Sequence, residues 1–202
     1  MEPTPQQPEP PILNITGEKV ALGPIRRDLL PLYLKWDNDF ELLGPRGMPI
    51  RPQTWEAEDA WYGRACTSEG ERWFTIYERA TLRPVGVTFL FNIHSADRTA
   101  EFGIWIGERE CWGQGSGTEA TTLMLDYGFT ALGLHNLMLQ VSSSNERGLR
   151  TYLRAGFRVV GRRRESYRLG GRVYDDIYMD CLATEFQSPV LRRLLLPADS
   201  AQ

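Results

Sequence analysis

The chain has 202 residues, of which 42% are hydrophobic and 24% are charged, so it can build one domain with one sizeable core. Its formal net charge of -3 argues against nucleic acid as the main partner. No apolar run is long enough to span a membrane, and the first residues lack the pattern of a signal peptide.

The cysteines Cys66, Cys111 and Cys181 are odd in number and lack the spacing of metal ligands. The chain has only two histidines. We therefore expect reduced thiols in a cytoplasmic protein, and no metal site.

The N-terminal residues 1–11 are rich in proline and glutamine and predict a disordered tail. Residues 13–22 predict a first strand with a turn at Gly17. A helix follows as far as Trp36, and it should begin near Leu29 or Leu30 because Pro31 is tolerated only in the first turn.

Acidic residues cluster after this helix, at Asp37, Asp39 and Glu41. They indicate either a solvated helix end or an acidic rim that binds a cationic substrate. The next segment, 44–52, interleaves three prolines with glycines and is a candidate lid.

Thr54 resembles a helix N-cap, and the tryptophans of the helix that it begins are expected in the core. Residues 72–78 and 84–93 predict an antiparallel hairpin that leads into a mostly buried strand, 99–106.

Gly113, Gly115 and Gly117 then form a turn before a helix whose apolar spacing starts at Ala120. Such a turn presents backbone N–H groups and a positive helix end to a phosphate, although glycines also serve tight connections. The spacing excludes both a P-loop and the G-x-G-x-x-G dinucleotide motif.

The remaining chain predicts a strand at 136–141, a helix at 146–155, and strands at 157–160 and 173–182. Arginines at 158 and 162–164 indicate a solvated strand end or a contact with phosphate. Altogether the pattern predicts an α/β domain with a mixed sheet.

Two motifs resemble the GNAT superfamily of acetyl-CoA-dependent N-acetyltransferases, in particular its RimJ/RimL branch. The first is AEFGIWIGERECWGQGSGTEA, and the second is Asn145, then Tyr152, then Gly156-Phe157. The resemblance covers about residues 12–183 and implies a single GNAT-like domain, whose mixed central sheet has a splayed strand pair flanked by helices. Residues 184–202 would form a C-terminal tail that caps the domain or makes a dimer contact.

The resemblance implies acetyl-CoA (coenzyme A) as the cofactor. Its pyrophosphate would lie on the turn and the helix start, and its pantetheine arm would lie along the strand before the turn, with Asn145 on the opposite side. The residues concerned are Ile104, Trp105, Ile106, Trp112, Gly113, Gln114, Gly115, Ser116, Gly117, Thr118 and Asn145.

The resemblance also implies direct attack of an amine on the thioester. Tyr152 occupies the position that protonates the leaving thiolate, with a core aromatic as the alternative. Glu101 is the leading candidate for the base that accepts the proton of the amine, directly or through water. The alternative is that Glu101 is a hydrogen-bonded glutamate of the core. Asp175 either holds the substrate amine or braces the sheet. The family often has Ser or Ala where Gly148 stands, so no serine contacts the sulfur there.

Acceptors implied by the resemblance are small cationic metabolites, antibiotics, polyamines and protein N-termini. The partner is therefore a small-molecule amine or a peptide N-terminus, and a homodimer is a further expectation. The alternative function of a different class is a non-catalytic regulator that binds acyl-CoA. A third possibility is that the arginine run binds RNA.

Overall fold

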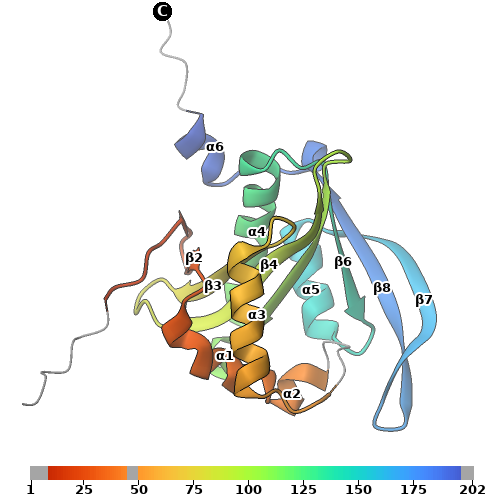
Figure 1. Cartoon of the computed structure of the whole chain (residues 1–202). Coiled ribbons are helices and arrows are strands. Elements are labelled where there is room, and N and C mark those ends of the chain that lie inside the picture. Colours follow the sequence, from red (N-terminus) through yellow and green to blue (C-terminus); the bar gives the residue numbers. More distant parts are fainter. Residues whose placement is uncertain (1–8, 45–49, 197–202) are drawn as a thin grey trace, which may run out of the picture.

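The computed structural model describes residues 9–44 and 50–196, which fold around one mixed sheet (Figure 1). Within these residues the sheet has eight strands in the order β1-β2-β3-β4-β5-β6-β8-β7. The strands are β1 (Ile15–Thr16), β2 (Val20–Pro24), β3 (Arg72–Glu78), β4 (Pro84–His94), β5 (Thr99–Ile106), β6 (Asn136–Ser142), β7 (Arg158–Leu169) and β8 (Arg172–Leu182).

Helices flank the sheet on both sides, as the predicted fold class requires. They are η1 (Arg27–Leu29), α1 (Leu30–Asp37), α2 (Phe40–Leu43), α3 (Trp55–Thr67), η3 (Arg109–Cys111), α4 (Ser116–Asp126), η4 (Tyr127–Ala131, a π-helix), α5 (Glu146–Ala155), η5 (Ala183–Glu185) and α6 (Leu191–Leu195). In Figure 1, α1 and α3 lie in front of the sheet, and α4 and α5 lie behind it.

The centre of the sheet splits between β5 and β6. These strands pair in parallel only from Thr99–Asn136 to Glu101–Met138, while β4 follows β5 in antiparallel pairing as far as Ile106. Beyond Glu101, β5 therefore offers backbone groups on the β6 side that no strand of residues 9–44 and 50–196 pairs with. The splayed strand pair predicted from the family resemblance is confirmed.

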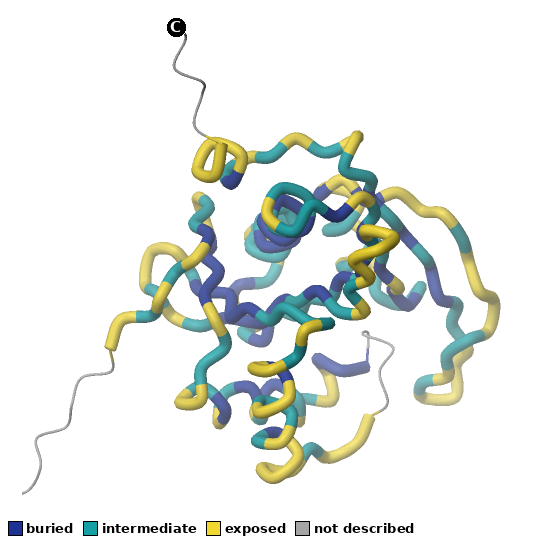
Figure 2. The backbone as a smooth tube through the Cα atoms, turned by 45° about the horizontal axis from the view of Figure 1, so that its top comes forward, coloured by how far each residue is buried: buried dark blue, intermediate teal, exposed yellow. Residues whose placement is uncertain are grey.

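Each face of the sheet has its own apolar cluster. Phe102 packs with Leu123 of α4 on one face, and Val87 packs with Tyr33 and Trp36 of α1 on the other. Figure 2 shows the buried backbone concentrated in the central strands and in α4, with exposed segments at the periphery. Alternation of side chains along β5 sends Phe102, Ile104 and Ile106 to one face and Glu101 and Trp105 to the other.

The predicted helix starts are confirmed. Pro31 lies in the first turn of α1, where its missing N–H removes no helical hydrogen bond. Thr54 caps α3, because its hydroxyl accepts a hydrogen bond from Ala57 N at 3.3 Å.

The prediction for β7 is wrong in length, because the strand continues to Leu169 instead of ending at Val160. It is the last strand of the sheet and mostly exposed, so its arginines break the apolar pattern without breaking the ladder with β8. The arginine run lies inside this strand, where Arg158 pairs with Glu185 at 2.7 Å.

The helix α4 begins at Ser116, four residues before the predicted apolar spacing starts. The short helix α2 is absent from the sequence prediction because four residues give no periodicity. Asp39 caps it by accepting hydrogen bonds from Glu41 N at 3.1 Å and Leu42 N at 3.2 Å.

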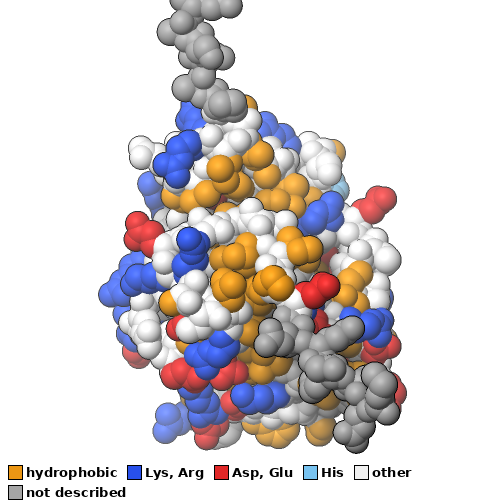
Figure 3. All heavy atoms as spheres, turned by 90° about the vertical axis from the view of Figure 1, so that its left-hand side faces the viewer, with side chains coloured by type: hydrophobic (Ala, Val, Ile, Leu, Met, Phe, Trp, Pro, Cys, Tyr) orange, Lys and Arg blue, Asp and Glu red, His pale blue; other side chains and the backbone are white. Residues whose placement is uncertain are grey.

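The C-terminal segment packs against the domain and is held there by Asp126 of α4. Its Oδ2 atom accepts hydrogen bonds from Val190 N at 3.0 Å and Leu191 N at 2.8 Å, and Leu191 is buried. Leu194 and Leu195 of α6 remain exposed, and Figure 3 shows apolar side chains on this side of the molecule.

Parts of three predicted segments lie outside the described residues: 1–8 of the N-terminal tail, 45–49 of the candidate lid and 197–202 of the C-terminal tail. None of the helices in the described ranges combines the length and the apolar character that crossing a bilayer requires.

Candidate active site

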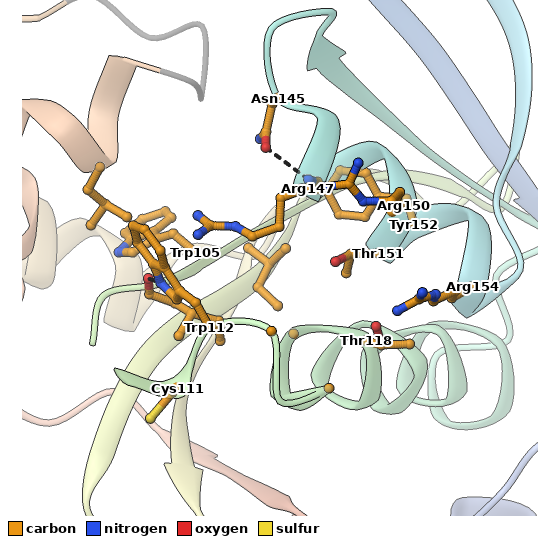
Figure 4. A pocket seen from close by; sticks show the side chains of 17 residues that line it. Trp105, Cys111, Trp112, Thr118, Asn145, Arg147, Arg150, Thr151, Tyr152 and Arg154 are labelled. Atoms are coloured by element: carbon orange, nitrogen blue, oxygen red, sulfur yellow. Dashed lines mark hydrogen bonds between the residues drawn. The ribbon is translucent and has the colours of Figure 1, made fainter. Parts of the chain in front are cut away.

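A cavity of about 290 Å³ lies where β5 leaves β6, between the glycine turn and α5 (Figure 4). It contains residues of both predicted motifs. Its lining comprises Leu42, Ile104, Trp105, Ile106, Cys111, Trp112, Gly113, Gly115, Gly117, Thr118, Asn145, Arg147, Gly148, Arg150, Thr151, Tyr152 and Arg154.

The glycine turn has the backbone that its composition predicts. Gly113 and Gly115 have φ values of 74° and 91°, which side chains with a Cβ rarely adopt. Gly115 is the residue before α4, so the free N–H groups of the first helical turn border the cavity. This arrangement fits a pyrophosphate.

Glu119 of α4 fastens the turn to the β1–β2 hairpin. Its carboxylate accepts hydrogen bonds from the backbone N–H groups of Glu18 at 2.9 Å, Lys19 at 2.7 Å and Val20 at 2.7 Å. A Cβ atom at Gly17 would lie 2.7 Å from the carboxylate carbon of Glu119, so a side chain there would require this carboxylate to shift. Lys19 Nζ also donates a hydrogen bond to the backbone carbonyl of Gln114. Gln114 itself does not line the cavity.

Trp112 joins the turn to the free edge of β5. Its Nε1 atom donates a hydrogen bond to the Ile106 carbonyl at 2.9 Å. The guanidinium carbon of Arg147 lies 3.5 Å from the centroid of the same ring, which is a cation–π contact. Burial lowers the pKa of Arg147 from its ordinary value.

Asn145 borders the cavity and begins α5. Its side-chain oxygen accepts a hydrogen bond from Gly148 N at 2.9 Å, so Asn145 of the second motif is also the N-cap of α5. A Cβ atom at Gly148 would lie 2.6 Å from Asn145 Nδ2. A side chain at position 148 would therefore require the Asn145 amide to shift.

Tyr152 lines the cavity and also packs in the core. Its ring contacts Phe102 and Phe157 edge-on, with centroids 6.2 Å and 6.1 Å apart. The two interpretations of this tyrosine are therefore compatible, since one part of the ring is packed while the side chain borders the cavity.

Glu101 lies outside the cavity lining. It is the last residue of β5 paired with β6, and it points to the face opposite Phe102. Its Oε1 atom accepts a hydrogen bond from Asn92 Nδ2 at 2.8 Å. A role as base would require a water-mediated route from that face.

Two of the acidic residues after α1 share one arginine. Asp39 forms an ion pair with Arg109 at 2.7 Å, and Glu41 pairs with the same guanidinium. The hydrogen bond from Arg109 lowers the pKa of Asp39. Asp37 is the last residue of α1, and its charge acts on a buried carboxyl of α3.

That carboxyl belongs to Glu58, which lies on α3 and does not line the cavity. Glu58 is 1% exposed, and its Oε1 atom has no hydrogen-bond partner among the described residues. Burial, and secondarily Asp37, raises its pKa to about 7. Its spacing from Trp61, Tyr62 and Ala65 is i+3, i+4 and i+7, so helical periodicity could have identified it as inward-facing.

Asp175 is engaged within the β7–β8 pair. It accepts a hydrogen bond from Glu165 N at 2.7 Å and forms an ion pair with Arg162. The hydrogen bond from Glu165 N, followed by the one from Arg162, lowers the pKa of Asp175. These contacts agree with the sheet-bracing alternative, and Asp175 does not line the cavity.

Within the described ranges, no group of three His, Cys, Asp or Glu side chains could hold a metal ion. The polar groups that border the cavity include backbone N–H groups of the turn, three arginines, and the side chains of Cys111, Thr118, Asn145, Thr151 and Tyr152.

Residues 19–158 match the family of acetyltransferase (GNAT) domains. The chain belongs to this family. It is 33% identical to a spermidine N(1)-acetyltransferase of Escherichia coli (strain K12) over 81% of this chain and 86% of that protein. It is 30% identical to an α/β-tubulin N-acetyltransferase of Mus musculus over 72% of this chain and 64% of that protein.

The fold agrees with these relatives. A spermidine N-acetyltransferase of Vibrio cholerae, solved in complex with CoA and spermine, superposes with a TM-score of 0.77. It is 25% identical and covers 83% of this chain and 97% of that one. The chain is therefore an acetyl-CoA-dependent N-acetyltransferase, which favours the enzyme over the non-catalytic regulator. The family is confirmed, whereas the branch assignment stays a proposal.

Proposed function

We propose that this enzyme transfers the acetyl group to a primary amine of a small polycationic acceptor of the polyamine type. The main support is the 33% identity to a spermidine acetyltransferase over most of both chains. A polyamine is a small cationic amine, one of the acceptor classes that the family resemblance implies.

Charge on the helices beside the cavity supports a cationic acceptor. Leu42 and Trp105 belong both to the cavity lining and to the cluster formed with α1. The same region carries the carboxyls of Asp37 and Glu58, on α1 and α3. Negative charge on these carboxyls would favour an ammonium group nearby, but Glu58 itself is buried and lies outside the cavity lining.

The other predicted substrate contacts are weaker candidates. Arg109 forms ion pairs with both Asp39 and Glu41, and Arg162 forms an ion pair with Asp175. We keep these three as predicted contacts that an acceptor could use only by competing with an arginine.

Acetyl-CoA supplies the activated acyl group as a thioester. We propose that the turn from Trp112 to Thr118 holds its pyrophosphate, that Ile104, Trp105 and Ile106 bind the pantetheine amides through the backbone, and that Asn145 closes the opposite side. The cavity, the split strand and the positive-φ glycines fit such a molecule.

Two side chains carry the proposed proton transfers. Tyr152 donates its proton to the departing sulfur, since it lines the cavity in the helix that faces the turn. Glu101 accepts the proton of the amine through water from the opposite face of the split sheet. Backbone N–H groups near Ile106 stabilise the developing oxyanion.

A protein N-terminus is the second candidate acceptor. The relative from Mus musculus is named as a tubulin acetyltransferase. A Bacillus subtilis relative, 29% identical over half of this chain, is named as a putative ribosomal acetyltransferase. These relatives support the RimJ/RimL-like alternative within the family.

Free thiol release from acetyl-CoA separates these candidates. The panel contains spermidine, spermine, aminoglycosides and N-terminal peptides at equal concentrations. We expect the highest kcat/KM with a polyamine. A peptide that exceeds every polyamine would favour the second candidate, and no turnover with any amine would refute both.

We further propose a cytoplasmic homodimer whose contact includes the exposed leucines of α6. The double variant Leu194→Ser/Leu195→Ser leaves the buried Leu191 in place. It should have half the solution mass of the unmodified chain, and an unchanged mass would refute this contact.

A further inference from the structure

Three arginines of α5 line the cavity at positions i, i+3 and i+7: Arg147, Arg150 and Arg154. This spacing places them along one side of the helix. Thr151 lies between the last two and also borders the cavity. The side of the cavity opposite the glycine turn is therefore strongly cationic.

The three guanidinium groups differ in what they already contact. Arg147 stacks on Trp112, and Arg150 pairs with Glu146 of its own helix at 3.3 Å. Arg154 has neither a hydrogen bond nor an ion pair with any of the described residues. It is the arginine that a ligand could bind without displacing another side chain.

Figure 4 places these arginines at opposite ends of the cavity. Arg147 points toward Trp105 and Trp112, whereas Arg154 points across the gap toward Thr118 on α4. Thr118 follows the glycine turn, so Arg154 lies on the far side of the turn from the two tryptophans.

The phosphates of coenzyme A make different demands on this site. The pyrophosphate can be satisfied by the N–H groups of the turn and by the start of α4. The ribose 3′-phosphate is a separate dianion, and backbone groups already used for pyrophosphate cannot serve it. A guanidinium offers two parallel N–H donors that match phosphate oxygens.

We propose that Arg154, assisted by Arg150, binds the 3′-phosphate of the cofactor and selects coenzyme A over its dephosphorylated form. A competing explanation is that Arg154 contacts the pyrophosphate. Both molecules contain the pyrophosphate, and only one contains the 3′-phosphate, so comparing them separates the explanations.

Isothermal titration of the full chain with CoA and with dephospho-CoA tests this assignment without turnover. We expect the unmodified protein to bind CoA at least about tenfold more tightly, as a charge-assisted hydrogen bond would give. In Arg154→Ala this preference should fall to about twofold, with dephospho-CoA affinity unchanged. Arg154→Lys should retain part of the preference, because lysine keeps the positive charge but lacks the two parallel N–H donors of the guanidinium.

Arg164→Ala is the matched control, since it removes an arginine of β7 that does not line the cavity. It should keep the full preference at the same ionic strength. Melting temperatures of each variant, with and without CoA, verify folding and give a second readout of binding. Equal affinity of the unmodified protein for both ligands, or equal weakening of both ligands in Arg154→Ala, would overturn the proposal.

Discussion

Trp112 Nε1 donates a hydrogen bond to the Ile106 carbonyl at 2.9 Å, and this contact joins the glycine turn to the free edge of β5. It brings together two parts of the predicted cofactor site across five intervening residues. The same ring supports Arg147, so one side chain organises both the edge and one end of the cavity.

Replacing Trp112 with Phe should weaken acetyl-CoA binding about fivefold. The variant removes one hydrogen bond, which typically contributes about 1 kcal/mol, and keeps an aromatic face for Arg147. Trp112→Leu should weaken binding further, because it removes both contacts. Titration calorimetry measures the series, and equal affinity of the Phe variant and the unmodified protein would contradict this role.

Replacing Glu119 with Ala should lower the free energy of unfolding by about 2 kcal/mol. The carboxylate accepts three backbone hydrogen bonds from the β1–β2 hairpin, and hydrogen bonds to charged groups are among the stronger ones. Urea denaturation measures the effect. Glu18→Ala is the control, since its side chain is exposed, and it should change stability by less than about 0.5 kcal/mol. A similar loss of stability in both variants would argue against the stabilising role of the Glu119 carboxylate.

Sequence reasoning succeeded where local chemistry determines the element. The bounds of β5 and α5 agree with the prediction, because an apolar run and a helix ending in Gly156 are local signals. The glycine turn belongs to the same group. Its backbone conformation depends on the absence of Cβ atoms, which the sequence states directly.

Long-range partners limited the prediction of the site. Arg109 forms ion pairs with Asp39 and Glu41 from a different segment, so the acidic rim could not be judged from its own residues. Asp175 similarly lies against Arg162 across the β7–β8 pair. Alternation along β5 puts Glu101 on the face opposite Phe102, but the contact of Tyr152 with Phe102 joins distant segments, so their own sequences do not show that Glu101 and Tyr152 lie on different faces.

Replacing Tyr152 with Phe should lower kcat about 100-fold while acetyl-CoA affinity changes little. The variant keeps the ring that packs against Phe102 and Phe157 and removes only the hydroxyl. Steady-state kinetics and calorimetry give the two quantities. Tyr127→Phe, on a tyrosine outside the cavity lining, should retain full activity. A Tyr152→Phe enzyme with unchanged kcat would exclude the proposed acid.

Replacing Glu58 with Gln should stabilise the protein at high pH. The pKa of Glu58 is about 7 in the folded state, above the ordinary value of 4.5, so the folded protein binds this proton more tightly than the unfolded chain. The associated stability is fully present below about pH 4.5 and is lost as the pH rises through 7.

At pH 8 the Glu58→Gln variant should therefore exceed the unmodified protein by about 2–3 kcal/mol, and this gain should shrink toward pH 5. Denaturation at a series of pH values measures it. Glu56→Gln, an exposed acid in the same helical turn, should show no such trend. A gain that is independent of pH would show that Glu58 does not titrate as described.

Product analysis with spermidine tests the central claim most directly, because direct transfer in a ternary complex leaves no acetyl group on the enzyme. Mass spectrometry should show an unmodified protein after incubation with acetyl-CoA alone. Adding spermidine should give acetylated spermidine and free CoA in equal amounts. An acetylated protein that then passes its acetyl group to the amine, or thiol release without an acetylated acceptor, would contradict the account.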